Sequence, residues 1–164
     1  MAIIEINQLQ SVLKRGEKLM GLDLGTKTIG IALSDVMLTV ASPLETIQRT
    51  KFTKDAIRLQ ELIASHEVGA LVLGLPLSMD GTEGPRCQAT RDFARSFQER
   101  LTAQGHEDIP IALWDERLST SAVERMLVND VDMTRKRRGE VIDKLAATYI
   151  LQGALDALAH QSGA

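Results

Sequence analysis

Residues 18–35, KLMGLDLGTKTIGIALSD, form the stretch that decides the fold. Two short apolar runs flank a turn at residues 25–28, GTKT, which is the pattern of a β-hairpin inside a core. One acidic residue, Asp23, stands where the first apolar run would otherwise continue. Because a buried carboxylate is costly unless it is paired or bound to a cation, Asp23 is the first candidate for a functional residue.

The composition is that of a single globular domain. Of the 164 residues, 44% are hydrophobic and 25% are charged, which is enough for one core built from a sheet and its covering helices. The formal net charge of −3 and the 3% of aromatic residues argue against a generally basic surface or a base-stacking platform for nucleic acid. We expect a soluble cytoplasmic protein, because Cys87 is the single cysteine and the sequence has no signal peptide and no membrane-length apolar run.

The remaining patterns predict a mixed α/β sheet with helices on both faces. A third strand follows the hairpin directly and carries Pro43 near its start, which predicts an antiparallel meander with this strand at an edge. Later strands alternate with helices, as in parallel sheets. Thr53 is expected to cap the first helix, and Gly69 to close it. After the hairpin, we predict strands at residues 41–47, 70–74 and 109–114, and helices at about 53–66, 85–101, 119–129 and 140–159.

The predicted domain covers residues 18–160. Residues 1–17 form an amphipathic extension that packs on this domain, and residues 161–164 form a tail.

Acidic residues recur where the predicted elements meet. Asp23 lies on the first strand, Asp115 and Glu116 end the last strand, and Asp143 falls in the first turn of the last helix. Two Mg²⁺ ions bridged by such carboxylates can hold both the attacking water and the leaving oxygen of a phosphodiester. Strand alternation sends Asp115 and Glu116 to opposite faces, so one of them reaches the cluster, and the spacing does not decide which.

Each acid also has a purely structural explanation. A single Asp in a strand often marks a bulge or a strand end, and Asp115 and Glu116 could be solvated, with Arg117 as an ion partner. Asp143 in a first helical turn would be stabilised by the helix dipole alone. Against this, the alanines three and four positions later share its helix face and would let that face approach the sheet closely.

Two further features could contact a phosphate backbone. The basic run at residues 135–138 is one, with a solvated loop before the last helix as the alternative. The loop at residues 75–86, LPLSMDGTEGPR, is the other, because its glycines let backbone amides approach phosphate, although most loops of this composition are only connections.

Four blocks occur in order along the chain: GLDLGTKTIGIALSD, LVLGLPLSMDGTEGP, WDERLST and DKLAATYILQGAL. As a set, over residues 19–158, they resemble the YqgF/RuvX family, which has a ribonuclease H-like fold. The resemblance implies a metal-dependent nuclease, described both as maturing the 5′ end of precursor 16S ribosomal RNA and as resolving Holliday junctions. Carried over motif by motif, the acidic ligands are Asp23 in GLDLG, Glu116 in DER and Asp143 in DKLAA. The resemblance therefore selects Glu116, and it places the GLPLSMDG stretch at residues 74–81 and Arg117 beside the active site.

We therefore predict a nuclease that binds Mg²⁺ or Mn²⁺, as two ions, through Asp23, Glu116 and Asp143. Its expected partner is nucleic acid, precursor ribosomal RNA or branched DNA, within the ribosome or its precursor, with no membrane, and the protein acts as a monomer or homodimer. The candidate substrate-binding residues are Lys27, Arg86, Arg117, Arg135, Lys136, Arg137 and Arg138.

Two other classes fit parts of the sequence. The GLDLGT opening resembles the phosphate-binding hairpin of the actin, chaperone and sugar-kinase ATPases, but the chain is too short for their second domain. A P-loop is excluded because Thr26 stands where the motif needs a glycine before Lys27. A noncatalytic RNA-binding assembly factor is the third possibility, and it would gain nothing from clustered acids that repel phosphate.

Overall fold

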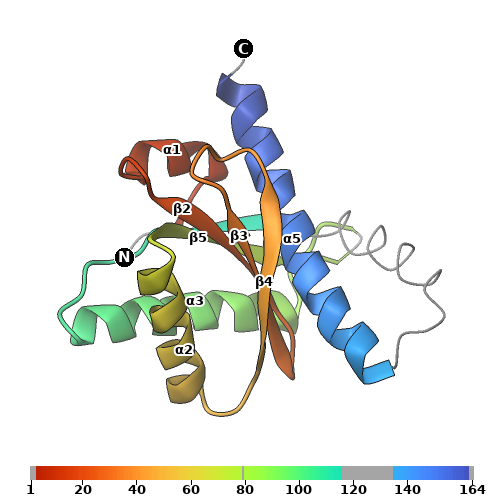
Figure 1. Cartoon of the computed structure of the whole chain (residues 1–164). Helices are drawn as coiled ribbons and strands as arrows, with labels where there is room; N and C mark the ends of the chain where they lie inside the picture. The colour runs from red at the N-terminus through yellow and green to blue at the C-terminus, as the bar shows by residue number, and fades with distance from the viewer. Residues whose placement is uncertain (1–2, 79, 116–134, 163–164) are drawn as a thin grey trace.

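A six-stranded mixed sheet runs through the centre of the protein in the order β1-β6-β5-β2-β3-β4 (Figure 1). This computed structural model describes residues 3–78, 80–115 and 135–162, with the backbone alone at 135–143 and 161–162. The strands are β1 (Ile3–Ile4), β2 (Lys18–Leu24), β3 (Thr28–Ser34), β4 (Ala41–Gln48), β5 (Val68–Leu75) and β6 (Ile111–Asp115). The helices are η1 (Ile6–Gln8, a 3-10 helix), α1 (Leu9–Val12), α2 (Phe52–Ser65), α3 (Pro85–Ala103) and α5 (Arg135–Ser162).

The sheet combines the predicted meander with parallel strands. β2, β3 and β4 pair antiparallel in sequence, whereas β5 pairs parallel with both β2 and β6. Pro43 lies on β4, the strand at one edge of the sheet, where a missing N–H costs no ladder hydrogen bond on the open side. The predicted mixed α/β fold with helices on both faces is confirmed.

Helices cover the two faces of the sheet differently. On one face, α2 and α3 pack on apolar residues of β2, β3 and β5, and on the other the long helix α5 crosses the sheet (Figure 1). We call these apolar groups the α2/α3 cluster and the α5 cluster. The α2/α3 cluster includes Met20, Leu22, Ile29, Ile31, Leu59, Leu71, Leu73, Phe93 and Phe97, and the α5 cluster includes Leu9, Leu19, Ala32, Val72, Ala112, Ala147, Ile150, Leu151 and Leu155.

The amino-terminal segment packs against the body of the domain. Ile3 and Ile4 form β1, which pairs parallel with β6 and extends the sheet by one edge strand. Leu9 of α1 is fully buried in the α5 cluster. The segment therefore contributes both a strand and a core side chain.

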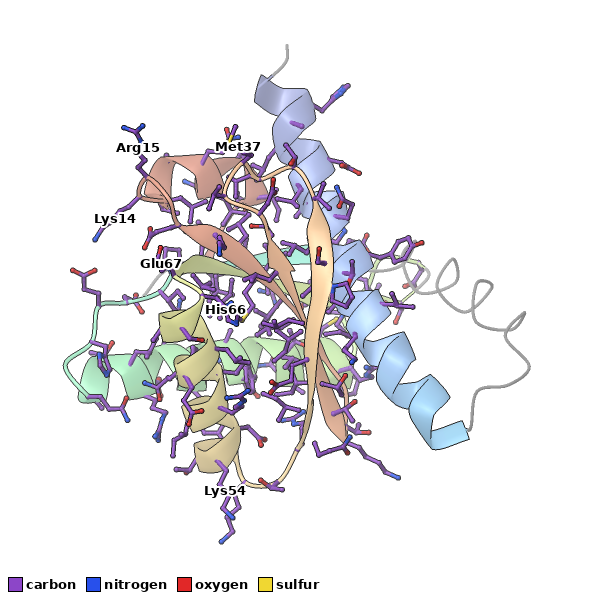
Figure 2. The ribbon with its side chains drawn as sticks, in the orientation of Figure 1. Lys14, Arg15, Met37, Lys54, His66 and Glu67 are labelled. Atoms are coloured by element: carbon purple, nitrogen blue, oxygen red, sulfur yellow. The ribbon has the colours of Figure 1, made fainter. Side chains whose placement is uncertain are left out.

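Both predicted ends of α2 were wrong. The N-cap of α2 is Lys51 and not Thr53, and the buried carboxylate of Asp55 accepts a hydrogen bond from the Thr50 amide at 3.2 Å instead. Gly69 does not close α2, because it lies within β5. The chain leaves the helix through Glu67, which has a positive φ of 55° and lies beside the C-cap residue His66 (Figure 2).

The last helix begins earlier than predicted. α5 starts at Arg135, so the basic run at residues 135–138 forms its first turn and is not a loop before it. Asp143 is then in the third turn of α5, beyond the reach of the helix dipole. No helix in the described ranges is both long enough and apolar enough to cross a bilayer. The predicted helix at 119–129 lies outside the described residues.

Candidate active site

Asp23 lies near the carboxyl end of β2, on the sheet face that α5 covers. Its neighbours Leu22 and Leu24 both pack on the α2/α3 cluster. Because successive side chains of a strand point to opposite faces, Asp23 shares the other face with Leu19 and Gly21. Its side chain is partly buried. Asp23 therefore places a carboxylate at the end of a central strand, on the sheet face that α5 covers.

Glycines flank Asp23 on both neighbouring strands. On β3 its direct partner in the antiparallel ladder is Gly30. On β5, Leu73 is the partner of Leu22, so the next row of the sheet carries Gly74 beside Asp23. Neither residue has a side chain, and both are buried. The two sheet positions directly beside the carboxylate therefore carry no side chain.

Helix α5 touches the sheet directly beside this position. A Cβ placed on Gly21 would lie 2.7 Å from the Leu151 Cβ and 3.0 Å from the Ala147 carbonyl oxygen. Such distances are closer than real side-chain contacts allow, so only glycine fits where α5 crosses β2. This close approach confirms the expectation that the alanine face of the last helix lies against the sheet.

The direction of α5 brings position 143 toward Asp23. Ala41 lies in the sheet row of Leu19, and its amide donates to Gln152 Oε1 at 2.9 Å. Gln152 is therefore level with Leu19, whereas Ala147 contacts Gly21 two residues further along β2. The helix thus runs antiparallel to β2. From the crossing at Ala147, one helical turn of about 5.4 Å leads back to Asp143. From Gly21, two strand residues, about 6.6 Å, lead on to Asp23. The backbones at 23 and 143 therefore meet at the same end of the sheet; the Asp143 side chain lies outside the described residues.

Asp115 lies on the opposite face from Asp23. On β6, Trp114 belongs to the α5 face, where its ring would meet a Cβ on Gly153 at 2.9 Å, while Leu113 packs on the α2/α3 cluster. Alternation places Asp115 with Leu113. Of the two neighbouring acids, Asp115 is thus removed from the Asp23 face, and Glu116 lies outside the described residues.

The predicted basic residues are only partly brought together. Lys27 lies in the turn between β2 and β3, and Arg86 is the second residue of α3; both are exposed. Within the described part of the chain, neither side chain makes a hydrogen bond or an ion pair. Arg117 lies outside the described residues, and for Arg135, Lys136, Arg137 and Arg138 only the helical backbone is described.

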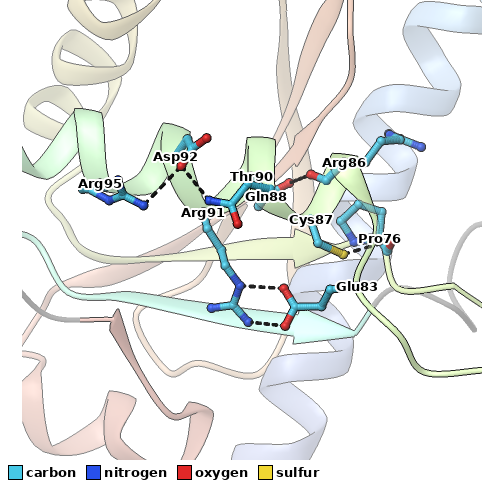
Figure 3. Close-up of polar contacts among 9 residues, drawn as sticks. All are labelled: Pro76, Glu83, Arg86, Cys87, Gln88, Thr90, Arg91, Asp92 and Arg95. Atoms are coloured by element: carbon cyan, nitrogen blue, oxygen red, sulfur yellow. Dashed lines mark hydrogen bonds and ion pairs between the residues drawn. The ribbon is translucent and has the colours of Figure 1, made fainter.

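The loop between β5 and α3 is held by its own contacts. The Ser78 amide donates to the Thr82 carbonyl at 2.9 Å, and the Cys87 thiol donates to the Pro76 carbonyl at 3.3 Å (Figure 3). A bidentate ion pair joins Arg91 to Glu83, with 2.7 Å from Nε to Oε1 and 2.9 Å from Nη2 to Oε2. These hydrogen bonds lower the pKa of Glu83. Figure 3 shows Arg86 turned away from these groups. The loop is thus fastened to α3, while Arg86 is left outside its network.

Sequence reasoning missed Arg49, the residue after β4. Its Nη1 donates to the Gly25 carbonyl at 2.6 Å, and its amide donates to the Lys27 carbonyl at 2.8 Å. The guanidinium also lies 5.8 Å from the centre of the Phe93 ring. The meander was the available signal, because pairing of Thr28 with Gln48 places the next residue beside the hairpin turn.

The described residues contain no group of three His, Cys, Asp or Glu side chains placed to hold a metal ion. Of the three predicted ligands, Asp23 alone has a described side chain. Its donor type fits, since a partly buried carboxylate offers the oxygen ligand that Mg²⁺ prefers.

Comparison with known proteins identifies the family. The model of the RuvX family, described as Holliday junction resolvase, matches residues 17–157. A protein of Rhodospirillum centenum named "Putative pre-16S rRNA nuclease" is 60% identical over 158 residues, 96% of this chain and 83% of its own. A protein of the same name from Rhodospirillum rubrum is 55% identical over 161 residues, 98% of this chain and 96% of its own.

Solved structures of low sequence identity share the fold. The yeast mitochondrial Holliday junction resolvase Ydc2 matches with a TM-score of 0.53 at 10% identity, covering 96% of this chain and 86% of its own. Thermus thermophilus RuvC in complex with a Holliday junction substrate matches with a TM-score of 0.51 at 13% identity, covering 90% and 96%. These matches confirm the predicted ribonuclease H-like fold.

Proposed function

The chain belongs to the RuvX Holliday junction resolvase family, and on this basis we propose that it is a metal-dependent nuclease that processes the 5′ end of precursor 16S ribosomal RNA. The proposal for the substrate rests on relatives of 52 to 61% identity that carry the name of a pre-16S rRNA nuclease. The observation that carries the site is Asp23, placed between glycines on the face that α5 crosses. We place this activity in the cytoplasm, where ribosomes are assembled.

Asp23, Glu116 and Asp143 would hold the metal. Asp23 supplies a carboxylate from the central strand, and the backbone of α5 passes close enough for Asp143 to supply another from the covering helix. Asp143 lies in the third turn of α5, so the helix dipole does not account for an acid there. With two Mg²⁺ or Mn²⁺ ions bound, such a site supplies an activated water and charge stabilisation for phosphodiester hydrolysis.

The chain's own residues have two further tasks. The close contact at Gly21 fixes α5 against β2, which holds positions 23 and 143 at a constant separation. The exposed cations Lys27 and Arg86 lie at the same end of the sheet and would orient the nucleic-acid backbone by its phosphates. Orientation of this kind is worth a large share of a nuclease's rate, because a misplaced scissile phosphate reacts slowly.

The decisive experiment replaces one ligand without changing its shape. Asp23→Asn keeps the size and a hydrogen-bonding oxygen, so we expect an unchanged melting temperature and a loss of cleavage of a precursor 16S ribosomal RNA fragment with Mg²⁺ or Mn²⁺. The matched control is Asp115→Asn, which alters an acid of the same sheet end on the opposite face and should leave cleavage near the wild-type rate. Undiminished turnover by Asp23→Asn would refute the proposed site.

The same assay separates the alternative substrates and classes. A four-way DNA junction tested beside the RNA fragment shows whether the family description or the name of the relatives applies to this chain. A noncatalytic RNA-binding factor would bind the fragment equally well in chelator and cleave it under no condition. Cleavage that depends on both the metal and Asp23 excludes that class.

A further inference from the structure

A small cavity lies on the other face of the same sheet end, between the β2–β3 turn and the start of α3. It measures about 90 Å³ and is lined by Leu24 and Gly25 of the hairpin and by Arg49, Arg86 and Phe93. A cavity needs only about 10–15 Å³ to hold one water, so a group of several non-hydrogen atoms fits. Leu24 directly follows Asp23 on β2, which places the cavity next to the proposed active site but on the α2/α3 face.

Two guanidinium groups make the lining positive. Arg49 is held in place, because its Nη1 donates to the Gly25 carbonyl and its Cζ lies over the Phe93 ring. Asp55, which does not line the cavity, forms an ion pair with Arg49, with 4.0 Å between its Oδ2 and the Arg49 Nε. Among the described residues, none that lines the cavity is acidic, and the Nη2 group of Arg49 has no hydrogen-bond partner.

Arg86 supplies the second charge without a competing partner. It lies in the first turn of α3, and among the described residues its guanidinium has neither an ion pair nor a hydrogen bond. Other arginines of α3 are engaged, since Arg91 pairs with Glu83 and Arg95 with Asp92 (Figure 3). Arg86 lies beside the cavity and, unlike Arg91 and Arg95, has no acidic partner among the described residues, so it is available to an anion.

The hairpin turn adds hydrogen-bond donors that could bind an anion. Thr26 lines the cavity, and its hydroxyl and amide make no hydrogen bond with any described residue. Guanidinium groups with backbone amides and a hydroxyl are the donors that hold phosphate in proteins. An apolar or cationic ligand would leave the Arg86 guanidinium without a counter-charge and the Arg49 Nη2 group without an acceptor among the described residues.

We infer that this cavity binds a phosphate of the substrate's nucleic-acid backbone other than the one that is cleaved. The inference rests on the proposed nuclease function for the identity of the ligand, but the cavity and its charges do not depend on that function. A strand held by this phosphate would pass around the end of the sheet from the α2/α3 face to the face of Asp23. Arg49 and Arg86 would then position the substrate, and Asp23 would hold the metal at the phosphate that is cleaved.

The test measures binding without cleavage. A fluorescein-labelled single-stranded RNA is titrated with the full chain in chelator over a range of salt concentrations. Log K falls as log salt rises, and loss of one phosphate contact in Arg86→Gln should make this slope less steep by about 1. Binding should weaken roughly tenfold. Arg95→Gln, on the same helix and paired only with Asp92 among the described residues, is the control and should bind like wild type.

Inorganic phosphate tests the cavity itself. In an amide NMR titration of the wild type, the Thr26 amide and the Arg49 Nε–H should shift, and in Arg86→Gln these shifts should be lost. Because Arg86 is exposed, this variant is expected to fold normally. Phosphate shifts without any change in RNA affinity would overturn the role in substrate binding, and wild-type RNA affinity and salt slope in Arg86→Gln would overturn the inference as a whole.

The two proposals fail separately. If Asp23→Asn still cleaves while Arg86→Gln loses RNA affinity, the metal site is wrong and the phosphate cavity stands. If Arg86→Gln binds as well as wild type while Asp23→Asn loses cleavage, the cavity has no role and the metal site stands.

Discussion

Replacing Gly21 by alanine tests whether the seating of α5 on β2 supports the active site. The added Cβ would lie 2.7 Å from the Leu151 Cβ, which is 0.7 Å short of the 3.4 Å at which ordinary contact begins. It would also lie 3.0 Å from the Ala147 carbonyl oxygen, and this backbone atom cannot turn aside as a flexible side chain can. The helix must therefore shift away from the sheet by several tenths of an ångström.

The expected size of the effect follows from these contacts. Overpacking of this kind costs about 1–3 kcal/mol, and the lower entropy of the unfolded alanine chain offsets about 0.4–1 kcal/mol of it. We expect Gly21→Ala to lower the free energy of unfolding by about 1–2 kcal/mol. Because position 143 lies one helical turn from the contact, cleavage should fall by about 10- to 100-fold in protein that is still folded.

Urea unfolding followed by far-UV circular dichroism and by Trp114 fluorescence measures the stability change. Trp114 is the only tryptophan of the chain and packs against Gly153 of α5, so its emission reports on the same interface. Gly84→Ala is the control for an added Cβ without a clash, because a Cβ there meets nothing within 4 Å; since Gly84 is the N-cap of α3, this variant should lose at most about 1 kcal/mol and keep full cleavage. Wild-type stability of Gly21→Ala would refute the close approach, and lost stability with full cleavage would refute its role in the site.

Two further predictions concern a buried side chain of the amino-terminal segment and a carboxylate in the connection between β3 and β4. Leu9→Ala should lower the free energy of unfolding by about 2–5 kcal/mol in urea titration, because Leu9 is fully buried; a loss below about 1 kcal/mol would mean that α1 is not part of the core. Hydrogen bonds from the Thr39 hydroxyl and from the amides of Thr39 and Val40 lower the pKa of Asp35 from 3.8 to about 2. The folded-state pKa lies below the unfolded one, so this stabilisation is complete above about pH 5 and is lost as the pH falls through the folded-state pKa to about 1. Asp35→Asn should therefore be less stable than wild type by about 1 kcal/mol at pH 7, with the difference shrinking steadily below about pH 4, and a constant difference down to about pH 2 would contradict the assignment.

The core of the fold could be predicted because alternation and apolar runs report on burial. The hairpin, the edge strand with Pro43 and the buried strand β5 all follow from side-chain patterns along single segments. Helix ends were less predictable, because their signals compete. At the start of α2 the side chain of Asp55 accepts a hydrogen bond from the Thr50 amide, and Thr53 does not act as the cap. At the end of α2, Glu67 has a positive φ, a conformation that usually favours glycine.

The start of α5 could not be predicted from apolar periodicity. Residues 135–140, RKRRGE, contain no apolar side chain, so nothing in them marks a face turned toward a core. Arginine, lysine and glutamate are nevertheless good helix formers when solvated, which explains why the helix extends through them. The error mattered for function, because the earlier start moves Asp143 out of the first turn and removes the dipole as its structural explanation.

The sequence singles out Asp23 of the candidate site but not the residues that surround it. Asp23 is conspicuous in a strand because carboxylates are rarely found among apolar residues, whereas the glycines beside it come from separate strands and become neighbours only through the register. Arg49 likewise has no local signal; it acquires its position when β4 pairs with β3. Sequence patterns report on burial within a single strand or helix, whereas the site depends on contacts between residues of different strands and helices.

The two faces of the sheet end explain how a chain with a net charge of −3 could bind a polyanion. On the α5 face, the proposed acids need cations before any phosphate can approach them, which the divalent ions would supply. On the α2/α3 face, Arg49 and Arg86 line a cavity with no acid among the described residues that line it. The hairpin turn joins the faces, with Asp23 and Leu24 as adjacent residues of one strand. Binding would therefore depend on charges separated by the sheet, and neither the net charge nor a generally basic surface would be needed.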